Sequence, residues 1–320
     1  MARAFIGDMA YSLGATRYEL AESAAAGRLC SSPDDLLAAG FARHHVCPPG
    51  DGSYDLARGA TDRLPLNDGV DAIVYNTCLP QNGSIGDLAA WEATGDVKHL
   101  MEFPAGHLQT DLGLDTAVVF GLTQQGCTGM LGALRLADAL LASEPEWERV
   151  LCVSADRFPP GARYEQSYNV ISDGAAACLV TARPAPGTRG LRLVATHQIT
   201  NGGLHTASDD ESVGTFFSYV PLLVRQTLAR AGLTTADIDW VVPQNTNRHA
   251  WRIVAGLLGI DHERVWQRTL PDVAHAISAD NIINLSSLLE SAELRPGQRI
   301  LLAMAGHGLN WQATVVEVTA

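Results

Sequence analysis

The sequence predicts an α/β protein made of two similar halves. Strand-like and helix-like segments alternate along the whole chain, which is typical of α/β folds. Two segments of the first half also recur, in the same order, in the second half. The length of 320 residues agrees with this organisation, because domains average roughly 150 residues.

Eight apolar segments rich in β-branched residues are predicted to form buried strands. They lack the regular polar alternation of a half-exposed strand, which indicates that helices cover both faces of the sheet. These segments are residues 71–75, 116–120, 149–153, 175–180, 191–195, 238–242, 299–303 and 313–318.

Helical periodicity is clearest in four segments, which are residues 130–141, 219–231, 250–258 and 282–289. Residues 81–95 and 201–217 are predicted to be loops that shape a pocket. The acidic run Asp209-Asp210-Glu211 within the second loop is expected to be solvated surface.

A surface connection is predicted at residues 183–190, where proline and glycine are dense near the middle of the chain. It divides the chain into an N-terminal half, residues 1–182, and a C-terminal half, residues 191–320. Two stretches of each half resemble each other, which indicates a weak internal duplication. The paired stretches are Asp71–Thr77 with Asp239–Asn245, and Arg149–Ala155 with Arg299–Ala305.

The composition excludes several classes of protein. Hydrophobic residues make up 47% of the chain, which is more apolar surface than a disordered protein carries. A net charge of −13 argues against a nucleic-acid binder, because such proteins need clustered Lys and Arg. No apolar run reaches the length of about 18 residues that a membrane span needs, and Asp8 interrupts the N-terminal stretch where a signal peptide would stay apolar. We therefore expect a cytoplasmic protein.

Cys127 stands apart from the other cysteines. The six cysteines are scattered without a C-x-x-C pair, so neither a metal site nor a disulfide framework is expected. Cys127, however, follows a strand-like segment and directly precedes the helical segment at residues 130–141. The unpaired N–H groups and the dipole at a helix N-terminus favour the reactive thiolate form of a cysteine. Glycines on both sides of Cys127 leave little bulk, so this helix is expected at the centre of the fold.

Four motifs resemble those of the thiolase superfamily, and within it the ketoacyl-ACP synthase III group. Gln124–Gly129 resembles the nucleophile segment of that group, and Ser172–Ala177 resembles its D-G-A-x-A turn and strand. Trp240–Asn247 matches the position of its P-H-x-x-N segment, and Ala305–Trp311 resembles its C-terminal G-G-G-x-x-W loop. The four matches occur in the family's order and span nearly the whole chain.

The resemblance implies a thiolase-like fold of two duplicated halves in five αβαβα layers, and a homodimer formed through the N-terminal half. It also implies a ping-pong acyl transfer in which Cys127 takes an acyl group from an acyl-CoA or acyl-carrier-protein thioester. The backbone N–H groups of Cys127 and of Gly308, or its neighbour His307, would bind the oxyanion. No tightly bound cofactor is implied, since the phosphopantetheine thioester is itself the donor substrate.

The chain departs from the condensing members of the family at two positions. The histidine of the P-H-x-x-N segment is replaced by Gln244, whose amide donates a hydrogen bond but is neither an acid nor a base near neutral pH. The asparagine of the family's H-G-N segment has three candidate counterparts. These are Ile277 on a gapless alignment, and Asp280 or Asn281 if the loop is shifted.

The spacing of His275 and Asp280 resembles the H-x-x-x-x-D pattern of synthase III-like acyltransferases from natural-product pathways. Those enzymes move an intact acyl group onto a hydroxyl or an amine. His275 and His307 are the candidates to replace the missing base, and Asp280 is either a helix N-cap or a carboxylate that orients a histidine. The candidate substrate-binding residues in these segments are Asn245, Asn247 and Asn281.

Of the two possible donors, acyl-carrier protein and acyl-CoA, the sequence favours the carrier protein. The tryptophan and arginine that clamp adenine in CoA-using members are absent from residues 32–41. The acidic helix of a carrier protein would instead dock on basic residues such as Arg43, Arg248 and Arg252.

The sequence therefore predicts an acyltransferase of secondary metabolism that loads an acyl group onto Cys127 and passes it to a hydroxyl or an amine. One alternative is decarboxylative Claisen condensation, the C–C bond-forming reaction of ketoacyl-ACP synthase III. A second alternative is a non-catalytic partner subunit. The replacement at Gln244 favours that alternative, whereas the intact segment around Cys127 argues against it.

Overall fold

Nine strands form a continuous sheet in the order β11-β12-β13-β10-β1-β9-β6-β4-β5. The computed structural model describes residues 4–184, 190–204, 206–306 and 309–319. The strands of the sheet are β1 (Phe5–Leu13), β4 (Ala72–Asn76), β5 (Val118–Leu122), β6 (Arg149–Asp156), β9 (Gly174–Thr181), β10 (Leu191–Thr200), β11 (Trp240–Pro243), β12 (Arg299–Gly306) and β13 (Asn310–Val318). Two small two-stranded sheets lie outside it and comprise β2 (Thr16–Glu19) with β3 (Arg43–Val46), and β7 (Glu165–Gln166) with β8 (Asn169–Val170).

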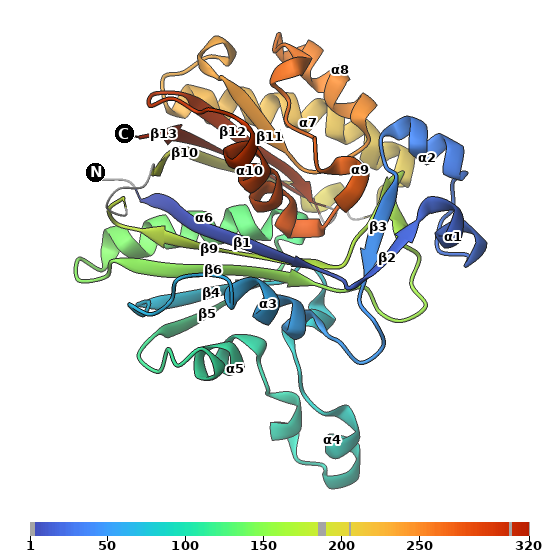
Figure 1. The fold of residues 1–320 in the computed structure, drawn as a ribbon, viewed down its shortest axis with the longest axis vertical. Helices are drawn as coiled ribbons and strands as arrows, with labels where there is room; N and C mark the ends of the chain where they lie inside the picture. Colours follow the sequence, from blue (N-terminus) through green and yellow to red (C-terminus); the bar gives the residue numbers. More distant parts are fainter. Residues whose placement is uncertain (1–3, 185–189, 205, 307–308, 320) are drawn as a thin grey trace.

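Helices pack on the outer faces of this sheet and between its two sets of strands (Figure 1). They are α1 (Leu20–Ala25), α2 (Pro33–Ala39), α3 (Ser53–Thr61), α4 (Leu88–Thr94), α5 (Pro104–Asp111), α6 (Gly129–Ser143), α7 (Asp209–Arg230), α8 (Arg248–Leu258), α9 (Leu270–Val273) and α10 (Asp280–Ser291). Within the described residues, no helix is both long enough and apolar enough to cross a membrane.

The two halves repeat one topology. In the first half β1 pairs with the last strand β9, which leads through β6 to β4 and the edge strand β5. In the second half β10 pairs with the last strand β13, which leads through β12 to β11. The parallel pair β4–β6 corresponds to the parallel pair β11–β12. Within the described residues, two residue pairs between β1 and β10 join the halves into one sheet.

An identical hydrogen bond marks the repeat in each half. Asp71 Oδ2 accepts the N–H of Arg149 at 2.8 Å before β4, and Asp239 Oδ2 accepts the N–H of Arg299 at 2.8 Å before β11. These residues open the stretches whose similarity predicted the duplication. The predicted duplication is therefore confirmed, whereas the limits 1–182 and 191–320 stay a prediction, because residues 185–189 lie outside the described part of the chain.

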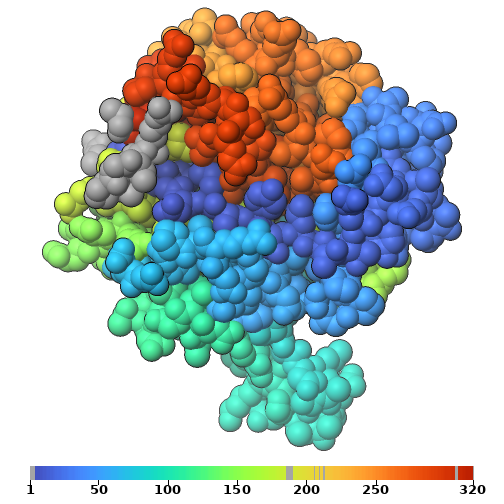
Figure 2. Space-filling model, viewed as in Figure 1, coloured from blue at the N-terminus to red at the C-terminus, as the bar shows by residue number. Residues whose placement is uncertain are grey.

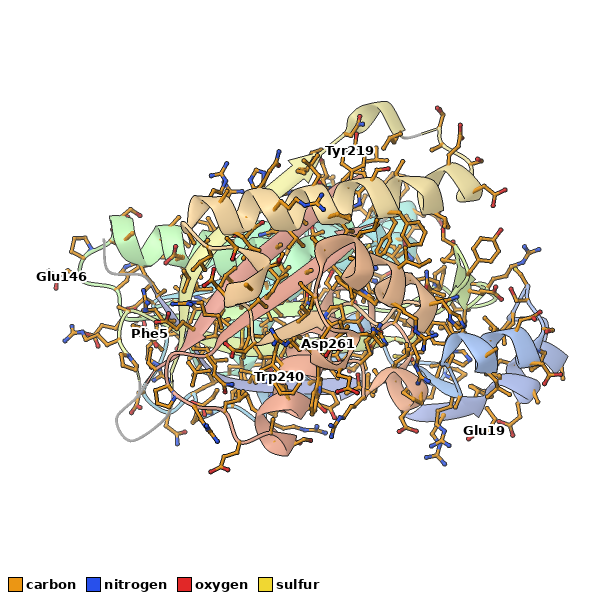
Figure 3. The ribbon with its side chains drawn as sticks, turned by 90° about the horizontal axis from the view of Figure 1, so that it is seen from above. Phe5, Glu19, Glu146, Tyr219, Trp240 and Asp261 are labelled. Atoms are coloured by element: carbon orange, nitrogen blue, oxygen red, sulfur yellow. The ribbon has the colours of Figure 1, made fainter. Side chains whose placement is uncertain are left out.

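Five layers are visible in Figure 1. α7 and α8 cover the strands of the second half, α6 and α10 lie between the two sets of strands, and α3 and α5 cover the first half on the other side. In the view from above, the long helix α7, which carries Tyr219, runs across the molecule (Figure 3). The predicted αβαβα fold is thus confirmed.

The central layer forms the main core. Met130, Leu131 and Leu134 of α6 are fully buried, as are Ile282 and Ile283 of α10. Small residues at Gly129, Gly132 and Ala133 allow this close packing, as the composition of the segment predicted.

The eight predicted strands and the four predicted helices are all present, with two corrections. α7 begins at Asp209, so the acidic run predicted to be a loop forms its first turn. The reason is a capping box, in which Ser208 Oγ accepts the N–H of Glu211 while the Glu211 carboxylate accepts the N–H of Ser208 at 2.8 Å. In addition, β1 was missed because Gly7 and Asp8 interrupt its apolar residues, although it occupies the middle of the sheet.

The region predicted to be a loop at residues 81–95 contains α4. This helix and its flanking segments project away from the rest of the molecule (Figures 1 and 2). Several large apolar side chains there are exposed, among them Leu88, Val97, Met101 and Phe103.

Candidate active site

A cavity of about 880 Å³ lies where the carboxyl ends of strands from both halves meet. Cys78, Cys127 and Phe158, which follow β4, β5 and β6, line it from the first half. Gln244, which follows β11, lines it from the second half together with His275. Ligand sites in α/β sheets form at this edge because the loops after parallel strands converge there.

Cys127 lies in the turn η3 (Gly126–Thr128), directly before α6. The residue is 7% exposed and lines the cavity, so it is not sealed in the core. The turn needs a glycine at residue 126, because the backbone there has a φ of 53°. Opposite, a Cβ placed on Gly306 would lie 3.0 Å from the backbone nitrogen of Cys127, so a glycine is needed for this close approach of the C-terminal loop.

His275 and Asp280 form a buried pair beside Cys127. His275 Nδ1 and Asp280 Oδ2 are 2.5 Å apart. Backbone N–H groups hold the carboxylate, because Ala276 donates to Oδ1 at 2.7 Å and Asn245 donates to Oδ2 at 2.6 Å. The His275 ring also hydrogen-bonds Cys127, which leaves Nε2 as the nitrogen that faces the sulfur.

The environment of His275 favours its charged form. Burial opposes protonation of the ring, but the charge of Asp280 and the hydrogen bonds to Asp280 and Cys127 outweigh it and raise the pKa of His275 to about 10. At neutral pH an imidazolium therefore faces the sulfur of Cys127. Such a neighbour favours the thiolate, which is the nucleophilic form of cysteine.

Asp280 is the first residue of α10, and Ala279 occupies the N-cap position. Of the two roles left open by the sequence, the geometry therefore matches a carboxylate that orients a histidine. This arrangement fixes the ring so that Nδ1 faces the carboxylate and Nε2 faces the cavity.

Gln244 is also fixed in orientation. Its amide oxygen accepts the N–H of Ala305, and the residue lines the cavity. The amide NH₂ is then the end that can donate to a substrate. Gln244 can thus bind a carbonyl oxygen, but it cannot remove a proton.

Ile277 is one of the three candidate counterparts of the family asparagine. It lines the cavity, whereas Asn281 is completely buried and its amide donates to the carbonyls of Val242 and Ala303. Of the three candidate counterparts, Ile277 is thus the one that lines the cavity, and its correspondence to the family asparagine stays a prediction. Ile277 has a φ of 54°, which is rare for a β-branched residue and marks local backbone strain.

Two of the predicted substrate-binding residues are corrected. Asn245 and Asn281 are fully buried and are not among the residues that line the cavity. The amide of Asn245 donates to Thr269 and to the carbonyl of Ala274, so it supports the His275 segment instead. Both were chosen because they lie in functional segments. Asn245 follows β11, where successive side chains point to opposite sides, whereas Asn281 lies on the buried face of α10.

Asn247 does line the cavity, and its side chain also accepts the N–H of His249 at the start of α8. Arg248 and Arg252 are exposed on the same helix, next to the cavity residues Asn247 and His249. Arg43 differs from them, because Glu19 and Asp272 hold its guanidinium at 3.2 Å and 2.7 Å.

The predicted oxyanion donor Gly308 and the candidate base His307 lie outside the described residues. Among the residues that are described, no group of three or more His, Cys, Asp or Glu side chains is arranged to hold a metal ion.

Sequence reasoning missed two polar residues of the site. Cys78 lines the cavity next to Cys127, and Asp156 lies buried behind it. Burial raises the pKa of Asp156 to about 7, against hydrogen bonds from Leu79, Asn82 and Cys78 that lower it. Their positions in the sequence could have indicated them. Cys78 follows a strand and Asp156 ends one, at the same edge of the sheet as Cys127.

Two family models match the chain. One is described as 3-oxoacyl-[acyl-carrier-protein (ACP)] synthase III and matches residues 123–202, and the other as the C-terminal part of the same enzyme and matches residues 228–318. Curated relatives named beta-ketoacyl-[acyl-carrier-protein] synthase III include that of Rhodospirillum rubrum, at 28% identity over 87% of this chain and 88% of the relative. That of Dinoroseobacter shibae is 24% identical over 87% of this chain and 88% of the relative.

Solved structures share the fold. The 3-oxoacyl-(acyl carrier protein) synthase III of Pseudomonas aeruginosa superposes with a TM-score of 0.80 at 21% identity, covering 99% of both chains. ChlB3, described as an acyltransferase, superposes with a TM-score of 0.79 at 20% identity, covering 99% of this chain and 98% of its own. The priming β-ketosynthase of the R1128 polyketide pathway superposes with a TM-score of 0.75 at 19% identity, covering 99% of this chain and 97% of its own.

Proposed function

The chain belongs to the ketoacyl-ACP synthase III-like family of the thiolase superfamily, and from that premise we propose that it is an acyltransferase of secondary metabolism. Cys127 takes an acyl group from an acyl-carrier-protein or acyl-CoA thioester and passes it to a hydroxyl or amine acceptor. The observation that carries this proposal is the His275–Asp280 pair beside Cys127.

The first half-reaction loads Cys127. Its thiolate attacks the donor carbonyl while backbone N–H groups around the sulfur hold the oxyanion. The carbon–sulfur bond of the donor then breaks, and the donor thiol leaves with the proton of the His275 imidazolium. His275 is neutral after this step, because it has given its proton to the donor thiol.

The second half-reaction transfers the acyl group. Neutral His275 accepts the proton of a hydroxyl or amine as that group attacks the thioester carbonyl. The bond to Cys127 breaks, and the thiolate forms again beside the imidazolium. Asp280 keeps Nε2 of the ring directed at the acceptor throughout both steps.

The residues of decarboxylative condensation are replaced in this cavity. Condensing relatives assist the loss of carbon dioxide by binding the thioester carbonyl with a histidine and an asparagine. Here Gln244 and the apolar Ile277 occupy those positions, so of these two positions only Gln244 offers a donor to an enolate. The likeness to ChlB3 supports acyl transfer in addition.

The test is to incubate the protein with acyl thioesters, first acetyl-CoA and then acyl-carrier protein, and to follow the intact mass. We expect an acyl adduct on Cys127 that disappears when an amine or alcohol acceptor is added. Release of carbon dioxide from a malonyl thioester, coupled to chain extension, would instead support condensation. The names of the curated relatives favour this alternative. Absence of any adduct would support the non-catalytic partner subunit.

We propose a carrier protein as the donor, docked at the cavity mouth. Arg248 and Arg252 are exposed cations on α8, whose first residues border the cavity. Replacing both with glutamate should weaken loading from acyl-carrier protein but not from acyl-pantetheine, which reaches only the cavity. Arg183→Glu, at an exposed position paired with Glu148, is the charge control.

We propose further that the protein is a homodimer joined along β5. This strand is the last of the sheet, and its first residue, Val118, is 46% exposed. An apolar side chain on an unpaired edge is an aggregation hazard unless a partner covers it. Light scattering after chromatography should report a dimer, and Val118→Lys should yield monomer, whereas Leu37→Lys on the exposed face of α2 should not.

A further inference from the structure

A second thiol lies against the proposed nucleophile. Cys78 follows β4, lines the same cavity as Cys127, and hydrogen-bonds the Cys127 side chain. The two residues lie in different loops of the first half. Both loops begin at the same edge of the sheet, because they follow the neighbouring parallel strands β4 and β5. None of the steps proposed above uses Cys78.

A buried carboxylate holds Cys78 in place. Asp156 accepts the N–H of Cys78 with both oxygens, at 3.0 Å and 2.9 Å, and the N–H of Leu79 at 3.0 Å. The amide of Asn82 donates to the same carboxylate at 2.9 Å. Four hydrogen bonds therefore fix the loop that presents the Cys78 sulfur to Cys127.

A comparable pair elsewhere in the chain is sealed. Cys152 of β6 and Cys178 of β9 are directly opposite each other and hydrogen-bonded, but both are completely buried. Neither lines the cavity, so no reagent reaches them in the folded protein. Accessibility, and not contact alone, distinguishes the Cys78–Cys127 pair.

We propose that Cys78 is a resolving cysteine, which captures Cys127 as a disulfide when a hydroperoxide oxidises it. This inference rests on the proposed role of Cys127 as a reactive thiolate. It assigns a reversible modification site to the cavity and a role to the second thiol. While the disulfide is present, Cys127 cannot accept an acyl group.

The chemistry balances with a hydroperoxide as oxidant and proceeds in two steps. The Cys127 thiolate attacks a peroxide oxygen, the O–O bond breaks, and the leaving oxygen takes the His275 proton, which leaves a sulfenic acid. The Cys78 sulfur then attacks the sulfenic sulfur, the S–O bond breaks, and the Cys78 proton leaves with the hydroxide as water. With hydrogen peroxide, two thiols are oxidised and the peroxide is reduced to two waters. A dithiol reverses the modification by exchange.

The electrostatics of the site favour this order of events. The hydrogen bond to Cys127, burial, and the charges of Cys127 and Asp156 all raise the pKa of the Cys78 thiol, so Cys78 remains protonated while Cys127 is the thiolate. Oxidation of Cys127 to a neutral sulfenic acid removes its charge from the neighbourhood. Cys78 then becomes the better nucleophile of the pair.

The test treats the full-length protein with hydrogen peroxide, followed by alkylation and non-reducing peptide mapping. We expect a peptide that links Cys78 to Cys127, while Cys152 and Cys178 remain thiols and act as the internal control. Dithiothreitol should restore acyl loading of the treated wild type. In Cys78→Ser, peroxide should instead oxidise Cys127 to the sulfinic acid. Dithiothreitol should then fail to restore acyl loading to the level of the untreated variant.

Cys30→Ser, which removes an exposed cysteine outside the cavity, should form the same linkage as the wild type. Sulfinic acid on Cys127 of the wild type without the linked peptide would overturn the proposal, as would full recovery of Cys78→Ser by dithiothreitol. The peptide map of the wild type decides the question even if the variant does not fold. It is also independent of acyl transfer, so failure of the proposed function is detected separately, by the absence of an acyl adduct.

Discussion

The turns before α6 and α10 occupy equivalent places in the two halves but carry different chemistry. α6 leads into β6 and α10 into β12, the counterpart of β6 in the repeat. Each helix follows a short turn, η3 (Gly126–Thr128) or η7 (Ile277–Ala279), whose first residue has a φ of 53° or 54°. The second residue is Cys127 in one turn and Ser278 in the other.

The two turns also touch, since Ser278 Oγ donates to the carbonyl of Gly126 at 3.3 Å. The first turn holds the proposed nucleophile, whereas the second is bracketed by His275 and Asp280. The repeat thus contains two adjoining helix starts, of which one carries the proposed nucleophile and the other lies beside the proposed base. The difference teaches that the site depends on contact between the halves and on neither half alone.

The largest contrast is expected at the second residue of each turn. Cys127→Ala should lower acyl transfer on the order of 10⁴-fold or more and abolish the acyl adduct, because the nucleophile is lost. Ser278→Ala should remove one hydrogen bond and lower the free energy of unfolding by about 1 kcal/mol. Intact-mass measurement and chemical denaturation check the pair. An adduct of unchanged size on Cys127→Ala would refute the assignment of the nucleophile.

The next contrast lies within the second half, between the proposed base His275 and the amide side chain of Gln244. His275→Gln should slow transfer to the acceptor by about 10²–10⁴-fold, because proton removal is lost. Gln244→Ala should cost about tenfold, the equivalent of one neutral hydrogen bond. Single-turnover kinetics of the isolated acyl-enzyme measure both effects. Equal rates for His275→Gln and the wild type would show that His275 is not the base.

Asp280→Asn should affect stability in a pH-dependent way. The folded pKa of His275 is raised to about 10 from an ordinary value of 6.5, so the pair stabilises the fold fully below pH 6.5 and loses this contribution as pH rises through 10. Near pH 6 the variant should be less stable by about 3–5 kcal/mol, the usual cost of breaking a buried ion pair. Denaturation at pH 6, 8 and 10 measures the free energy of unfolding of the wild type and of the variant. The difference between the two proteins should shrink as the pH rises. A constant difference across this range would contradict the ion pair.

The smallest contrast compares glycines at two helices. A Cβ on Gly129, the first residue of α6, would overlap the Asn76 side chain, so Gly129→Ala should lower the free energy of unfolding by about 1–3 kcal/mol. Gly256 in α8 has open space at the Cβ position, so Gly256→Ala should raise stability by about 0.5–1 kcal/mol. Thermal denaturation of the two variants should therefore show stability changes of opposite sign. Equal effects would mean that the close contact at Asn76 relaxes without cost.

Prediction from the sequence succeeded where the signal was local. The strands of both halves were found because buried strands are continuous apolar runs, and Cys127 was found because glycines and a helix start surround it. β1 was missed because Gly7 and Asp8 break its pattern, although neighbours on both sides hold it in the sheet. The start of α7 was missed because its capping box lies in an acidic stretch that also suits a loop.

The candidate site was predictable only in part. His275 and Asp280 were proposed from their spacing, but only the structure shows that the carboxylate contacts the ring. Asn245 was wrongly given to the substrate, because residues adjacent in sequence at a strand end face opposite sides. Cys78 was not singled out, because nothing near it in sequence relates it to Cys127.

The amino-acid order alone was enough to establish an α/β repeat with a cysteine at the start of its central helix. Periodicity, capping and glycine content act over a few residues, so they can be read along the chain. Which side chains meet that cysteine was a matter of long-range packing. His275 and Cys78 come from segments far from residue 127, and they reach it because the duplicated strands end at one shared edge.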